Sequence, residues 1–135
     1  MKLALLSDLH ANELALQACL AHAQAQGASQ WAILGDLVGY GAQPSAVVDH
    51  CQRMADAGAI VLRGNHEDMA LHPPAQATRQ GEHTAHWTHE RLSGSQRQWL
   101  AQLPLTARLG SVFLVHASAN EPAQWRYVED EGSAS

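Results

Sequence analysis

Several features that would place the chain in a specialised class are missing from its 135 residues. No run approaches the roughly 20 apolar residues that a membrane span needs. The apolar stretch at residues 2–6 is broken by Ser7, Asp8 and His10, which leaves it too short for a signal peptide. We therefore expect a cytoplasmic protein with no membrane segment.

Cysteine and positive charge are also scarce. The chain has two cysteines, Cys19 and Cys51, and each falls inside a helical pattern. We expect both to be buried, reduced thiols, which excludes a disulfide scaffold and a Cys-Cys metal site. The eight Lys and Arg residues are scattered along a chain of net charge -5, so no basic stripe predicts nucleic-acid binding.

The first half of the chain alternates between two kinds of pattern. Apolar runs at 2–7, 31–34 and 59–62 predict short buried strands. Amphipathic patterns at 12–27 and 44–57 predict helices between them. Because strands that alternate with helices form parallel sheets with right-handed crossovers, we expect an α/β fold.

The second half predicts four more elements and no internal repeat. They are helices at 78–92 and 95–103 and a strand pair at 106–109 and 112–115. Ser95 and Gln98 have the spacing of a capping box at the start of the second helix. After Ser118 the pattern is lost in a polar, acidic segment. Length and an apolar content of 46% favour a single domain over residues 1–135.

Residues that can bind metal follow four of the apolar runs. These motifs are Asp8-Leu9-His10, Gly35-Asp36, Gly64-Asn65-His66-Glu67 and His116. In an open α/β sheet, ligands bind at the carboxyl ends of the strands, so these residues should converge in space. Asp36 suits a bridging role, because one carboxylate can bind a metal through each oxygen. The set predicts a site for two divalent cations, which can make hydroxide from water and clamp a phosphate.

Each motif also has an ordinary structural explanation. Gly35-Asp36 and Gly64-Asn65 are typical of turns, and His116 alone would be an ordinary strand-end histidine. It is their joint occurrence at strand ends that favours a metal site. We expect Glu67 to brace the motif loop and Arg63 to be a solvated side chain.

The four motifs resemble those of the calcineurin-like metallophosphoesterase superfamily, and the resemblance extends from Asp8 to Ser118. The segment Gly35–Gly41, followed by Pro44, resembles a branch of bacterial and archaeal phosphodiesterase-like members. This resemblance implies a metallophosphoesterase-type β-sandwich flanked by helices. It also implies a metal-dependent phosphoesterase that acts on a phosphodiester or a small phosphorylated substrate.

The resemblance further implies a role for each site residue. Asp8, His10 and Asp36 would bind one metal, and Asp36, Asn65 and His116 the other. His66 would be catalytic: it would contact the phosphate and assist the leaving group. Asn12 matches a substrate-binding position, and it is an equally good helix N-cap. The oxygen and nitrogen ligands suit Mn, Fe, Zn, Ni or Co.

Two departures from the family pattern leave other functions open. Gly39 and Tyr40 replace the Asp-Arg of the Ser/Thr protein phosphatase branch, which argues against that activity. No histidine follows His116, so the Gly-His-x-His block that normally ends the pattern is missing. The alternatives are a protein phosphatase, a diadenosine polyphosphatase-like hydrolase, or a truncated metal-binding domain with little activity.

The missing block also predicts how the site could be completed. We expect a domain truncated at its C-terminus, which a further C-terminal segment or association as a homo-oligomer would complete. Three histidines at i, i+3 and i+6 on a predicted helix could supply ligands, although a substrate-facing polar wall or a solvated face is favoured. They are His83, His86 and His89.

Overall fold

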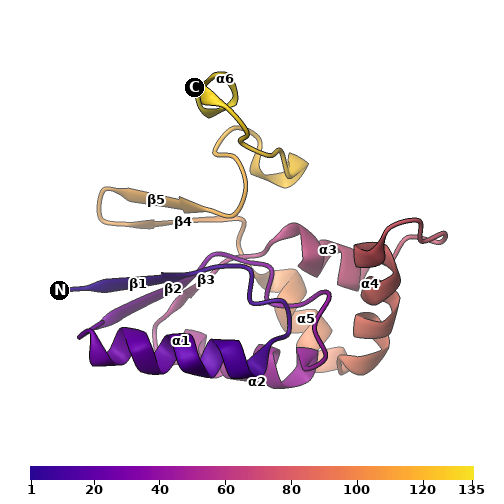
Figure 1. Ribbon diagram of the computed structural model, residues 1–135, viewed down its shortest axis with the longest axis horizontal. Coiled ribbons are helices and arrows are strands. Elements are labelled where there is room, and N and C mark those ends of the chain that lie inside the picture. Colours follow the sequence, from indigo (N-terminus) through magenta and orange to yellow (C-terminus); the bar gives the residue numbers. More distant parts are fainter.

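Three parallel strands form the first sheet of the computed structural model, which describes residues 1–135 (Figure 1). Their order is β1-β2-β3, and their bounds are Leu3–Leu6, Gln30–Ile33 and Ile60–Val61. β1 pairs with β2 over its whole length, whereas only Ala32 and Ile33 of β2 pair with β3. The parallel sheet predicted from the strand and helix order is therefore confirmed.

Two helices connect these strands and lie on one face of the sheet (Figure 1). They are α1 (Glu13–Ala25) and α2 (Pro44–Asp56). Asn12 is the N-cap of α1, since its Oδ1 accepts a hydrogen bond of 3.0 Å from the backbone N–H of Ala15. Pro44 stands in the first turn of α2, where its lack of an N–H costs nothing.

The main core lies between the two helices and the sheet. Ile33 and Val61 point from the strands toward Leu16 of α1 and toward Val47 and Val48 of α2, and all five side chains are buried. Alternation along the strands sends the neighbouring residues to the opposite face. That face therefore needs a second apolar cover.

A β-hairpin supplies this cover. β4 (Thr106–Leu109) and β5 (Val112–Val115) pair antiparallel, within the bounds predicted from the sequence. Leu114 packs against Ala32 and Leu62 in a second, smaller core. Helices on one face and a second sheet on the other give the β-sandwich expected from the family resemblance (Figure 1).

Three further helices pack together beyond the carboxyl ends of the strands (Figure 1). They are α3 (Asn65–Leu71), α4 (Gln80–Arg91) and α5 (Gly94–Gln102). The predicted capping box at Ser95 and Gln98 is wrong by two residues: Ser93 and Gln96 exchange the two bonds, at 3.1 and 2.9 Å. The reason is tertiary, because Gln96 also donates to Asp49 of α2 at 2.7 Å.

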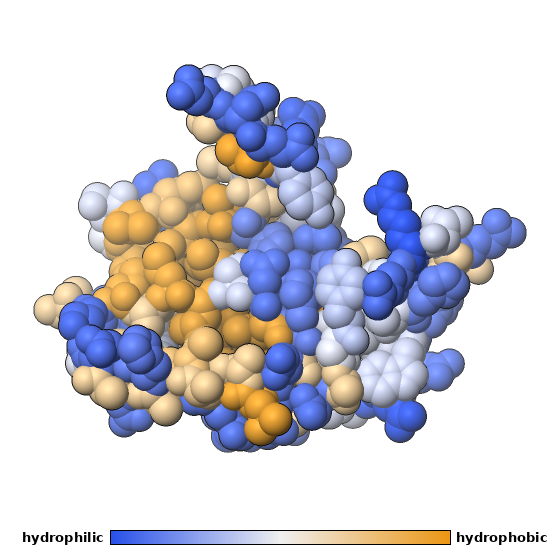
Figure 2. Space-filling view, viewed as in Figure 1, coloured by the Kyte–Doolittle hydropathy of each residue, from blue (hydrophilic) through white to orange (hydrophobic).

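The residues after the hairpin run away from the sheets (Figure 1). They contain the short 3₁₀ helix η1 (Pro122–Gln124) and the four-residue helix α6 (Glu131–Ala134). A broad apolar surface lies over the strands beside this segment (Figure 2). Leu5 of β1 and Val112 and Phe113 of β5 are the large apolar side chains of the strands that stay exposed.

Two side chains differ from their predicted environments. Cys51 is buried as expected, but Cys19 is exposed, because it lines an open groove between α1 and β1. Arg63 is not simply solvated: its Nε lies 3.1 Å from Asp68 Oδ1, and its Nη1 donates to the Ala101 carbonyl at 3.0 Å. None of the helices combines the length and the apolar character that crossing a bilayer would need.

Candidate metal centre

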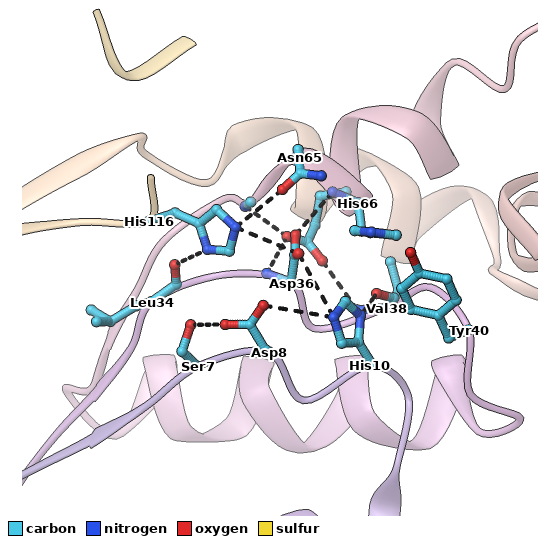
Figure 3. Close-up of polar contacts among 12 residues, drawn as sticks. Ser7, Asp8, His10, Leu34, Asp36, Val38, Tyr40, Asn65, His66 and His116 are labelled. Atoms are coloured by element: carbon cyan, nitrogen blue, oxygen red, sulfur yellow. Dashed lines mark hydrogen bonds and ion pairs between the residues drawn. The ribbon is translucent and has the colours of Figure 1, made fainter. Parts of the chain in front are cut away.

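The predicted metal ligands lie together at the carboxyl ends of the strands (Figure 3). Asp8 and His10 follow β1, and Asp36 follows β2. Asn65 is the first residue of α3, just beyond β3, and His116 follows β5. The four motifs therefore converge as the sequence predicted.

Asp36 occupies the middle of this group and is only 3% exposed. Its Oδ1 accepts a hydrogen bond of 2.9 Å from the backbone N–H of His66. Its Oδ2 lies 3.4 Å from His116 Nε2 and 3.8 Å from His10 Nε2. The arrangement therefore offers Oδ2 as the shared donor, instead of one oxygen for each metal.

The two histidines beside Asp36 are oriented in the same way. His10 Nδ1 donates to the carbonyl of Val38 at 3.0 Å, and His116 Nδ1 donates to the carbonyl of Leu34 at 2.8 Å. Each ring thus directs its Nε2 toward Asp36. A histidine that binds metal commonly donates its other ring nitrogen to a backbone carbonyl, so both rings suit a metal.

The remaining donors complete two overlapping groups. Asp8 Oδ1 lies 3.6 Å from His10 Nε2, and Asn65 Oδ1 lies 3.1 Å from His116 Nε2. Donor atoms of Asp8, Asp36 and His116 all lie within 4.8 Å of one another. Those of His10, Asp36 and His66 do so as well. Carboxylate, amide and imidazole donors at this spacing fit divalent cations, while the division of ligands between two ions stays a prediction.

Charge interactions at the centre follow from this packing. Burial opposes ionisation of Asp36, but hydrogen bonds from His116 and from the His66 backbone hold its pKa below the ordinary value. The same contact with Asp36 raises the pKa of His116 to about 9. Burial lowers the pKa of His66, more than the Asp36 charge raises it. His66 is therefore a neutral imidazole near pH 7, while His116 carries a proton that a metal would displace.

Glu67 braces the loops that carry the ligands, as predicted. Its fully buried carboxylate accepts hydrogen bonds from the backbone N–H groups of Gly64, Asp36 and Val38, at 2.7, 2.8 and 3.1 Å. Burial, with the nearby Asp36 charge, raises the pKa of Glu67 to about 8. Gly64 is required at this point, because a Cβ there would lie 2.2 Å from Asp36 Oδ1.

His66 is held in place by packing, since its ring makes no hydrogen bond. The ring centroid lies 4.7 Å from that of Tyr40 and 4.8 Å from that of His10. Two glycines face its edges: a Cβ at Gly39 would lie 2.4 Å from His66 Nδ1, and one at Gly81 would lie 3.2 Å from Cε1. The space for this imidazole therefore depends on two residues without side chains.

The histidines of α4 do not join the site, so the prediction that they could complete it is wrong. His86 Nε2 and His89 Nδ1 donate to the carbonyls of Pro74 and Ala70, at 2.6 and 2.7 Å. His83 is exposed to solvent. None of the three has a ring nitrogen among the grouped donor atoms at the strand ends.

The sequence patterns missed the aromatic residues that surround the centre. Trp125 reaches it from the C-terminal segment, with its ring centroid 6.1 Å from that of His116. The only sequence signal was the grouping of Trp125 and Tyr127 in an otherwise polar stretch. Asn12 is engaged as a helix cap, and its contact with substrate stays a prediction.

Comparison with known proteins places the chain among phosphoesterases. The family model of the calcineurin-like phosphoesterases matches residues 1–133. Protein MJ0912 of Methanocaldococcus jannaschii, described as uncharacterized, is 29% identical over 132 residues, which cover 93% of this chain and 53% of that protein. A symmetrical bis(5'-nucleosyl)-tetraphosphatase of Shewanella sp. (strain MR-7) is 33% identical over 97 residues, which cover 70% of this chain and 35% of that enzyme.

Solved structures agree with this result. A metallophosphoesterase from Sphaerobacter thermophilus superposes with a TM-score of 0.78 at 31% identity, over 95% of this chain and 51% of that one. The hypothetical protein PH1004 from Pyrococcus horikoshii OT3 has a TM-score of 0.75 at 24% identity, over 89% and 56% of the two chains, and shares the fold. The chain thus spans about half the length of these two structures.

Proposed function

The chain belongs to the calcineurin-like phosphoesterase family, and we propose that it acts as a metal-dependent hydrolase of phosphoric ester bonds. We further propose a phosphodiester or another small phosphorylated molecule as the substrate. The observation that carries this proposal is that Asp36 Oδ2 faces the Nε2 atoms of two histidines, His10 and His116. That arrangement would allow two cations to share one carboxylate.

The residues present fit a pair of divalent ions drawn from Mn, Fe, Zn, Ni and Co. Asp8, His10 and Asp36 would hold one ion, and Asp36, Asn65 and His116 the other. Such ions supply positive charge to phosphoryl oxygens and lower the pKa of water. In His10 and His116, Nδ1 donates a hydrogen bond to a backbone carbonyl, and this bond keeps the metal-binding Nε2 directed inward.

His66 would contact the substrate and act in catalysis. Because burial lowers its pKa, the imidazole is neutral near pH 7, with one ring nitrogen protonated. That N–H can donate a hydrogen bond to a phosphoryl oxygen or to the leaving oxygen. Packing between Tyr40 and His10 keeps the ring at the edge of the metal group.

Hydrolysis of dinucleoside polyphosphates is the second candidate. The similarity to the symmetrical bis(5'-nucleosyl)-tetraphosphatase favours it. Protein phosphatase activity is less supported, because Gly39 leaves no room for a side chain beside His66. A metal-binding domain with little catalysis is the third candidate. The cytoplasmic location inferred from the sequence stays a prediction.

Turnover of bis(p-nitrophenyl) phosphate by the Mn²⁺-loaded chain tests the proposal. His66→Ala should keep its metal and lose roughly 10²–10⁴-fold in rate, the usual contribution of an acid–base group. His22→Ala, on the exposed surface of α1, is the control and should change neither quantity. A metal-loaded chain without turnover would leave the metal-binding domain as the function. Loss of metal from His66→Ala would make that residue a ligand.

A further inference from the structure

Two cavities open beside the metal centre, one on each side of Asn65. A cavity of about 480 Å³ lies on the side of His66, and one of about 270 Å³ lies on the side of His116. Asn65, Trp125 and Tyr127 line both of them. The C-terminal segment that carries Trp125 and Tyr127 therefore forms a wall between two spaces that meet at the ligands. In Figure 2 the surface is hollowed between this segment and the α3–α4 region.

The larger cavity holds an unusual share of the aromatic residues. The chain is only 5% aromatic, yet both of its tyrosines, Tyr40 and Tyr127, line this cavity together with Trp125. Tyr40 is 51% exposed and Tyr127 is 79% exposed, so their rings are not covered by the core. Exposed rings at a binding cavity are suited to stack on a flat ligand.

The charged side chains that line this cavity, Asp68, Glu82 and Arg79, differ in whether they already have partners. Asp68 is already paired with Arg63 at 3.1 Å. Glu82 is engaged by Thr78 and by the backbone N–H of Arg79, at 2.6 and 3.0 Å. The guanidinium of Arg79 makes no ion pair or hydrogen bond and lines the same cavity. One cation therefore remains available beside the aromatic rings.

Backbone strain is present in the C-terminal segment that forms the wall between the two cavities. Seven residues other than glycine have positive φ, and five of them lie in the loops of the metal centre. The other two are Glu121 (φ 51°) and Trp125 (φ 53°), which flank η1. A bulky residue rarely adopts this conformation, and such strain gathers at functional sites. Here it turns the chain so that the Trp125 ring meets His116.

We propose that Trp125, Tyr127 and Tyr40 form a stacking site for a nucleobase, which makes the substrate a nucleoside phosphoester. This rests on the proposed phosphoesterase function. A phosphodiester carries two substituents, and the metal centre lies between two cavities. The larger cavity on the His66 side, which Tyr40 lines in addition to Trp125 and Tyr127, takes the substituent that bears the base. The smaller cavity takes the second substituent.

Calorimetry with two probes tests this in the presence of Mn²⁺. AMP and ribose 5-phosphate share the sugar and the phosphate and differ only in the base. AMP should bind roughly 5- to 150-fold more tightly, the gain expected from stacking one base. Trp125→Ala and Tyr127→Ala should reduce that ratio toward one and leave ribose 5-phosphate binding unchanged. Tyr127→Phe keeps the ring and should keep the ratio.

A control variant and two outcomes make the test decisive. Trp87→Ala removes an exposed indole on α4, packed against Arg91 at 5.1 Å, and should leave both affinities unchanged. Equal binding of the two probes by the unaltered chain would overturn the stacking site while leaving the metal and phosphate sites intact. Failure of both probes to bind would overturn the proposed function and the stacking site together.

Discussion

Replacing Gly39 with alanine tests how the position of His66 is set. The backbone at Gly39 has φ +90°, a conformation that glycine adopts without strain. A Cβ built there would lie 2.4 Å from Nδ1 and 2.9 Å from Cγ of the His66 ring. Both distances are far below an ordinary van der Waals contact. The Cβ atom of His66 itself would lie only 3.2 Å from the added alanine Cβ, so a rotation of the ring alone does not relieve the contact and the whole side chain has to move.

Two effects of different size follow from this geometry. The left-handed backbone should cost about 1–2 kcal/mol of folding free energy. Relief of the contact needs a ring displacement of about 1 Å, and a misplacement of that size can lower turnover about 10²-fold. The metal content of Gly39→Ala should stay the same, since His66, whose ring is displaced, is not among the proposed ligands.

Gly27→Ala separates the two effects. Gly27 has φ +80°, and a Cβ there would meet nothing within 4 Å. The Gly27→Ala variant should be destabilised by a similar amount and should keep full turnover. Urea unfolding, metal analysis and hydrolysis of bis(p-nitrophenyl) phosphate are measured on both variants. Full activity in Gly39→Ala, or an equal loss in Gly27→Ala, would refute the claim that this glycine sets the position of a catalytic ring.

Three other predictions concern the ligands and the thiols. Asp36→Asn should lose more metal than Asp8→Asn, because Asp36 Oδ2 faces both histidines; equal losses by metal analysis would exclude the shared role. The metal-free pKa of His116 is about 9, so its proton must leave for metal to bind. Apparent Mn²⁺ affinity should therefore rise up to about tenfold per pH unit and level off near pH 9; a flat profile would contradict this. Burial raises the pKa of the Cys51 thiol to about 12, so a thiol reagent should modify Cys19 in the folded chain and both residues in urea. Rapid modification of both in the folded chain would contradict that burial.

Local rules were enough to predict much of the fold. The hairpin at Thr106–Leu109 and Val112–Val115 has the predicted bounds, because two runs of strand-forming residues flank a turn at Gly110. Helix α2 begins at Pro44 as expected. These features depend on residues that are near neighbours in the chain, so their patterns are visible in the sequence.

Local rules failed where distant residues compete. The spacing of Ser95 and Gln98 predicts a capping box, but the contact of Gln96 with α2 favours the start at Ser93. A helical pattern around Cys19 predicts burial, but the groove beside β1 leaves it exposed. Each outcome depends on a contact with a segment far away in the sequence.

The same distinction applies to the candidate site. The sequence by itself determined which residues could bind metal: Asp8, Asp36 and Asn65 follow strands of one parallel sheet, so they must lie at its carboxyl edge. Only the tertiary structure decided that Asp36 Oδ2 faces two imidazoles, and that strand-end carbonyls orient those rings. It alone brought Trp125 edge-on to His116, since no periodicity links the C-terminal segment to the strand ends. A motif specifies chemical groups, whereas their orientation depends on packing between distant parts of the chain.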